Sequence, residues 1–149
     1  MNDARIIVRT VEARDVVAVR QLLDQLGYSL EPEAVLRRLD AISKAHRHGL
    51  FIAEMDEQPV ALLHLFERPA LEKPPEAVVQ ALVVERTRRA GGIGRQMMMF
   101  AKHWARERGL PSVCLASRID RCASHAFYTT LGYERVATSH MFRKELAAP

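Results

Sequence analysis

The sequence predicts an α/β protein built around a mixed β-sheet. Two kinds of connection support this class. One short polar link joins two strand-like runs as a hairpin does, and longer amphipathic segments separate other strand-like runs as helical crossovers do. The third observation is size: the chain has 149 residues, 48% of them hydrophobic, which suits one domain with its own core. We therefore predict a single domain over residues 1–149.

The first half of the chain alternates strand and helix signals. Residues 5–8, Arg-Ile-Ile-Val, predict a first strand. Asp15 is a suitable N-cap for a helix whose apolar residues recur every three to four positions. Pro32 stands where the first turn of a helix tolerates proline, and a second apolar stripe follows it. Residues 50–54 and 60–67 are strand-like runs whose short connection predicts a hairpin.

The second half continues this alternation. Residues 68–76 contain three prolines and predict a loop. Residues 77–84 are apolar nearly throughout, as in a buried strand, and helical spacing follows from Ile93 to Gly109. The remaining predicted elements are a short strand at 112–116, a helix at 122–131 and two closing strands at 133–139 and 141–146. The expected order is β-α-α-β-β-β-α-β-α-β-β.

The composition is that of an ordinary globular protein. It excludes intrinsic disorder, and with two cysteines it excludes a disulfide scaffold. No apolar run approaches the ~20 residues of a membrane span, and the N-terminus lacks a secretory pattern. We therefore expect a cytoplasmic protein with reduced thiols and no membrane partner.

The positive charge is concentrated in one segment. Residues 86–108 carry seven basic and one acidic side chain, whereas residues 1–85 carry ten basic and fourteen acidic ones. A uniform basic coat would indicate nucleic acid, but a local cluster indicates a local anion. No nucleic-acid recognition motif accompanies the cluster, so we expect no nucleic-acid partner. The acidic first part would suit a cationic amine.

A glycine-rich turn joins the buried strand to the helix that follows it. Gly91, Gly92 and Gly94 leave the backbone uncovered where the first N–H groups of the helix lack partners and its dipole is positive. Such a terminus binds phosphate or diphosphate well. The spacing fits neither common nucleotide motif, because Gly94 is followed by Arg95 and Gln96, and the third glycine of the dinucleotide fingerprint is missing.

Two blocks of sequence resemble the GNAT superfamily of N-acyltransferases. Residues 89–94, Arg-Ala-Gly-Gly-Ile-Gly, are similar to the family's Gln/Arg-x-x-Gly-x-Gly/Ala loop for the diphosphate of acyl-CoA. Residues 121–133 resemble its helix with Phe-Tyr, three residues and then Gly-Phe/Tyr. The predicted element order also matches, so the resemblance covers essentially the whole chain. It implies a mainly antiparallel sheet flanked by helices, with strands four and five splayed apart.

The resemblance implies an acetyl-CoA-dependent N-acetyltransferase. Such an enzyme moves the acetyl group directly to a primary amine of a small molecule, peptide or protein, in a ternary complex. An acyl-CoA-binding sensor with the same fold and little turnover is the alternative. Arg121 and Ser124 stand where the family often has Asn and Ala, and Arg86 replaces its common Pro. The implied cofactor-binding residues are Leu82, Val83, Val84, Arg89, Ala90, Gly91, Gly92, Ile93, Gly94, Arg95, Arg121 and Ser124.

The implied catalytic groups are an acid and a base. Tyr128 matches the family's general acid, and a phenol of pKa ~10 can protonate a leaving thiolate. The identity of the general base stays open. Some members of the family carry a carboxylate in the middle of strand four, where this sequence has Gln80 and Ala81. His64 and Glu85 are candidates, and a water chain to bulk solvent is the preferred route.

The sequence predicts no metal site, since no His, Cys, Asp or Glu grouping has zinc spacing. His46 and His48 lie in a polar segment and are expected at the surface. The oligomeric state stays open, with a homodimer among the options.

Overall fold

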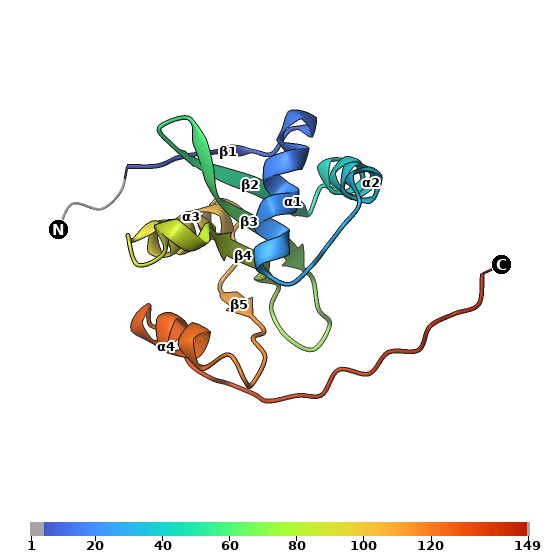
Figure 1. Cartoon of the computed structure of the whole chain (residues 1–149). Helices are drawn as coiled ribbons and strands as arrows, with labels where there is room; N and C mark the ends of the chain where they lie inside the picture. The colour runs from blue at the N-terminus through green and yellow to red at the C-terminus, as the bar shows by residue number, and fades with distance from the viewer. Residues whose placement is uncertain (1–4, 149) are drawn as a thin grey trace. The chain divides into compact units, whose positions relative to one another are not determined.

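The computed structural model describes residues 5–148, which divide into two compact units, one ending at Ala116 and one beginning at Ser117. The first unit holds a five-stranded sheet in the order β1-β2-β3-β4-β5. Neighbouring strands from β1 to β4 pair antiparallel, and β5 pairs parallel to β4. This confirms the mixed, mainly antiparallel sheet (Figure 1). The strands are β1 (Ile7–Thr10), β2 (His48–Met55), β3 (Gln58–Arg68), β4 (Glu76–Val84) and β5 (Val113–Leu115).

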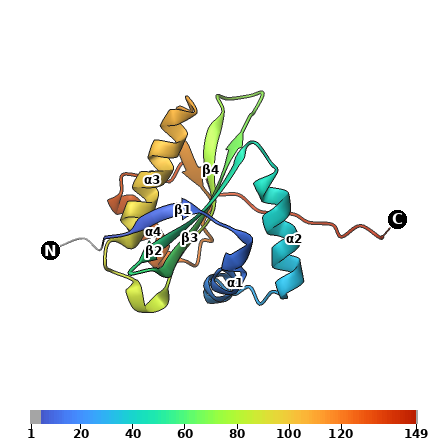
Figure 2. The same cartoon turned by 90° about the horizontal axis from the view of Figure 1, so that it is seen from above.

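Helices cover both faces of the sheet. In the first unit, α1 (Val16–Gln25) and α2 (Pro32–Ser43) lie on one face and α3 (Ile93–Glu107) on the other (Figure 2). Each of these three helices buries one apolar stripe, as the periodicity predicts. The α1/α2 side buries Val19, Leu22, Val35, Leu62 and Val83, and α3 buries Ile93, Met97, Met98, Ala101, Trp104 and Ala105. None of the helices in residues 5–148 is long and apolar enough to cross a membrane.

Particular residues determine the turn between β2 and β3 and the N-termini of α2 and α3. The link between β2 and β3 is a two-residue turn in which Asp56 and Glu57 both have positive φ, 50° and 62°. Such a turn matches the twist of paired strands, so the predicted hairpin forms. Pro32 occupies the first turn of α2, where its missing N–H costs nothing. Gly92, with φ 85°, is the N-cap of α3.

A charged cluster ties β1 to its neighbours. The Arg9 guanidinium donates to both carboxylate oxygens of Asp15 at 2.7 Å and to Glu54 of β2 at 2.7 Å. Asp15 also accepts the backbone N–H of Glu12 at 2.8 Å. The cluster therefore fixes the chain where it leaves the sheet and begins α1.

The second unit contains α4 (Cys122–Thr130) and an extended segment after it. The predicted helix at 122–131 is confirmed, but the two closing strands predicted at 133–139 and 141–146 are wrong. Within the described part of the chain, these residues join no sheet. Strand propensity is expressed only against a partner strand, and here Phe142 stays 91% exposed.

Candidate cofactor and active site

The parallel pair β4 and β5 opens partway along its length. Ala77, Val78 and Val79 pair with β5, and β4 then runs on to Val84 with no strand on that side among the described residues. β5 therefore covers only the first part of β4, and among the described residues the edge from Gln80 to Val84 has no paired strand. An open strand edge offers alternating N–H and C=O groups to an extended, amide-rich ligand.

The end of β4 turns one backbone N–H toward this open edge. The Glu85 N–H donates to Val60 of β3 at 2.7 Å. Since consecutive residues of a strand turn their N–H groups to opposite sides, the Val84 N–H faces away from β3. The Val84 carbonyl, on the same side, accepts the Arg89 Nε–H at 3.1 Å. Leu82 shares this orientation, whereas Val83 faces β3.

The glycine-rich turn delivers the chain from β4 to the N-terminus of α3. A single turn of 3₁₀ helix, η2 (Arg86–Arg88), follows β4. Ala90 and Gly92 both have positive φ, 65° and 85°, which reverses the backbone before α3 begins at Ile93. The first N–H groups of α3 therefore point out of the helix beside Arg95, and such amides hold anionic oxygens.

The Glu85 carboxylate is occupied by hydrogen bonds, unlike the carboxylate of a free general base. Its carboxylate accepts the backbone N–H of Thr87 at 2.8 Å and also the Thr87 hydroxyl. The Thr87 hydroxyl and backbone N–H hold the pKa of the Glu85 carboxyl below its ordinary value. The amide of Gln25, from the end of α1, lies against the same carboxylate at 3.4 Å.

His64 lies on β3 opposite Ala81, where β4 carries a bulge at Gln80. Its Nε2 makes a 2.9 Å hydrogen bond with Nδ1 of His48 on β2. Burial, and secondarily the charge of His48, lower the pKa of His64 to about 4. The expectation that His48 is an exposed surface residue is wrong, because the β2–β3 register places it diagonally beside His64 and stacked on Phe66.

The remaining candidates lie in the second unit. Tyr128 is on α4, and its ring contacts those of Phe127 and Tyr133 at centroid distances of 5.0 and 5.9 Å. Burial raises the pKa of the Tyr128 hydroxyl above its ordinary value, so it stays protonated at neutral pH. Arg121 precedes α4 and Ser124 lies in its first turn.

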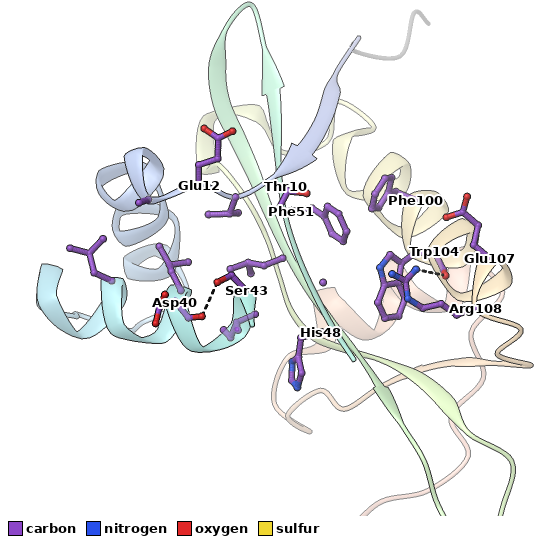
Figure 3. A pocket seen from close by; sticks show the side chains of 17 residues that line it. Thr10, Glu12, Asp40, Ser43, His48, Phe51, Phe100, Trp104, Glu107 and Arg108 are labelled. Atoms are coloured by element: carbon purple, nitrogen blue, oxygen red, sulfur yellow. Dashed lines mark hydrogen bonds between the residues drawn. The ribbon is translucent and has the colours of Figure 1, made fainter. Parts of the chain in front are cut away.

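A groove of about 580 Å³ lies at the opposite edge of the sheet, beyond the end of β1. Figure 3 shows Phe51, Phe100 and Trp104 on one side of β2 and Asp40 with Ser43 on the other. Gly49 of β2 belongs to this packing, since a Cβ there would lie 2.9 Å from the Trp104 Nε1. No group of three His, Cys, Asp or Glu side chains suited to a metal occurs in residues 5–148.

Known proteins resemble this chain along most of its length. The profile of the Acetyltransferase (GNAT) family matches residues 16–133. An uncharacterized N-acetyltransferase, YhdJ of Bacillus subtilis (strain 168), is 30% identical over 124 residues, 83% of this chain and 86% of the relative. A mycothiol acetyltransferase of Nocardia farcinica (strain IFM 10152) is 33% identical over 87 residues, 57% of this chain and 29% of the relative. The solved structure of aminoglycoside N-acetyltransferase AAC(6')-Iy in complex with CoA superimposes with a TM-score of 0.86 at 18% identity, covering 97% of this chain and 98% of its own.

Proposed function

Because the chain belongs to the acetyltransferase (GNAT) family, we propose that it moves the acetyl group of acetyl-CoA to a primary amine of a small molecule, peptide or protein. The observation that carries this proposal is the open edge of β4, which leads directly into the glycine-rich turn at the start of α3. An extended thioester with an anionic end fits such an edge followed by such a turn.

The chain's own groups suit each part of this substrate. The amides of the pantetheine arm pair with the open edge at Val84. The diphosphate takes the first N–H groups of α3 and the charge of Arg89 and Arg95. From their positions in the second sequence block, we assign Arg121 and Ser124 to the same substrate.

The transfer forms a bond from the amine nitrogen to the thioester carbonyl carbon and breaks the bond from that carbon to sulfur. Negative charge gathers on the carbonyl oxygen in between, and a fixed N–H donor stabilises it. We assign this donor to Leu82, whose N–H faces the open edge further from the glycine-rich turn, so that the Val84 N–H is left for the pantetheine arm. The thiolate leaves with a proton from Tyr128, whose raised pKa keeps that proton in place until sulfur departs.

The amine must lose a proton before it attacks. We assign this proton to water at the bulge of β4, where Gln80 is exposed and His64 lies opposite Ala81. His64 is neutral at pH 7 because of its low pKa, and in the tautomer whose Nε2 donates to His48 its Nδ1 can accept a hydrogen bond from that water. A carboxylate base is absent from this part of β4.

The decisive experiment follows release of free thiol from acetyl-CoA in the presence of a panel of amines and peptides. We expect amine-dependent release, reduced about 10²- to 10⁴-fold in Tyr128→Phe. Tight CoA binding without turnover across the panel would favour the alternative, an acyl-CoA sensor. Failure to bind CoA would refute both functions.

A further inference from the structure

The end of α1 is hydrogen-bonded to the turn that leaves β4. Gln25, the last residue of α1, accepts the backbone N–H of Arg86 through Oε1 at 2.8 Å. Its Nε2 donates to the Glu85 carboxylate at 3.4 Å. Because a backbone N–H can only donate, the first bond fixes which end of the amide faces the turn. One side chain thus contacts two consecutive residues some sixty positions further along the chain.

Glu85 in turn uses its polar groups to shape the same turn. Its N–H donates to Val60 at 2.7 Å and its carbonyl accepts the N–H of Arg88 at 2.9 Å. Its carboxylate is the N-cap of η2, since it accepts the backbone N–H of Thr87. A carboxylate engaged in this way stabilises a turn rather than removing a proton from an amine.

This turn stands between the two parts of the proposed acetyl-CoA site. On one side is the open edge of β4, ending at Val84, and on the other is the N-terminus of α3. Arg89 completes the connection by donating to the Val84 carbonyl at 3.1 Å. Any shift of the turn therefore changes the direction from the strand edge to the helix amides, and hydrogen-bonded recognition of a diphosphate depends on that direction.

We propose that Gln25 and Glu85 are positioning residues that hold the turn at 85–92 in the conformation that binds the acetyl-CoA diphosphate. This rests on the function proposed above. It replaces the candidate role of Glu85 as a base with a structural one, and it gives α1 a part in binding the acyl donor.

The test measures the dissociation constant for CoA by calorimetry, together with KM for acetyl-CoA and kcat. In Gln25→Ala and in Glu85→Gln, we expect the dissociation constant and KM to rise about five- to tenfold, the effect of losing one or two hydrogen bonds. We expect kcat at saturating acetyl-CoA to change less than about twofold, because no reacting group is removed. The double variant should show less than the product of the single effects, since both residues act on one turn.

Gln21→Ala is the matched control. Gln21 lies one turn earlier on α1 and lines the same surface depression as Gln25 and Glu85, but within the described residues it makes no hydrogen bond to the turn. Its CoA binding should equal that of the wild type. Thr87→Val, which removes only the hydroxyl contact to Glu85, provides an independent variant with a smaller expected rise of about threefold.

Two results would overturn the inference. One is a dissociation constant for CoA that is unchanged in Gln25→Ala and Glu85→Gln while both variants keep the wild-type unfolding temperature. The other is a Glu85→Gln variant whose kcat falls about 100-fold, with an altered pH profile and an unchanged KM, as a lost general base would give. Wild-type protein that binds no CoA would instead refute the proposed function itself.

Discussion

Replacing Arg9 by methionine removes the cation shared by two carboxylates at the start of α1. Methionine keeps most of the apolar stem and none of the donors. In Arg9→Met, Asp15 loses both of its 2.7 Å hydrogen bonds from the guanidinium and keeps the one from the Glu12 N–H. The Asp15 side chain is only 6% exposed, so water cannot fully replace the lost partner.

The expected cost is set by how deeply the cluster is buried. Removing one partner of a fully buried pair costs about 3–5 kcal/mol, and a surface pair costs about 0–1 kcal/mol. Arg9 and Glu54 are about one-fifth exposed, at 21% and 22%. We therefore expect Arg9→Met to lower the free energy of unfolding by about 3 kcal/mol at pH 7. For a chain of this length, that corresponds to a fall in Tm of about 6–12 °C.

The pH dependence gives a second, independent signature. The hydrogen bonds from Arg9 are the main cause that lowers the pKa of Asp15 in the folded protein. A carboxyl whose pKa is lowered by folding adds stability above its unfolded pKa, and that stability is lost as the pH falls through the folded value. The difference between wild type and Arg9→Met should therefore be full at pH 7 and shrink below about pH 4.

Urea unfolding of wild type, Arg9→Met, Asp15→Asn and the double variant measures these terms. The double variant should be more stable than the sum of the single effects predicts, because it leaves no unpaired charge. Arg14→Met is the control, since among the described residues Arg14 forms its ion pair with Glu12 at the surface, and its replacement should leave the free energy of unfolding nearly unchanged. A loss in Arg9→Met as small as the control's, or one that is the same at every pH, would refute the reasoning.

Three further outcomes can be measured on the same protein. Gly49→Ala should lower the free energy of unfolding in urea by about 1–3 kcal/mol, because the new Cβ would lie 2.7 Å from the Phe51 ring. Gly91→Ala should lower it by under about 0.5 kcal/mol, because the new Cβ would meet only the Arg88 carbonyl, at 3.4 Å. Equal losses in the two would contradict the packing argument. The free energy of unfolding should fall as the pH drops from about 6.5 toward 4, because folding lowers the pKa of His64 to about 4, and His64→Gln should flatten this slope. Iodoacetamide should modify the exposed Cys122 before the half-buried Cys114, because burial raises the pKa of the Cys114 thiol. Peptide mass spectrometry follows the order of modification, and the reverse order would contradict this expectation.

The sequence predicted those elements whose signals are local. The stripes of α1, α2 and α3, the hairpin after β2 and the glycine turn before α3 all depend on residues a few positions apart. The sequence could not predict contacts between distant segments. His48 is hydrogen-bonded to His64 because of the β2–β3 register. The positioning role of Glu85 becomes visible only from its hydrogen bond with Gln25, which lies sixty residues earlier in the chain.

The two closing strands failed for a related reason. Residues 133–146 have the composition of strands, but a strand exists only when another strand pairs with its N–H and C=O groups. Composition indicates that a segment is suited to be a strand, but it does not indicate whether another strand is present to pair with it. The open edge of β4 could be expected from the family resemblance, yet the direction of the Val84 N–H needed the bond from Glu85 to Val60.

The order of strands in the sheet is also their order along the chain, and this shapes how the protein comes to fold. Each strand from β2 to β4 pairs with the strand just before it in the chain, although two α-helices intervene between β1 and β2. β5 pairs with β4 only after the chain has passed through α3, and over three residues. This pairing extends over fewer residues than that of any other neighbouring strands of the sheet, so it gives the smallest return for closing its loop and belongs late in folding. During synthesis, the antiparallel part of the sheet can therefore assemble on the ribosome before β5 emerges to complete it.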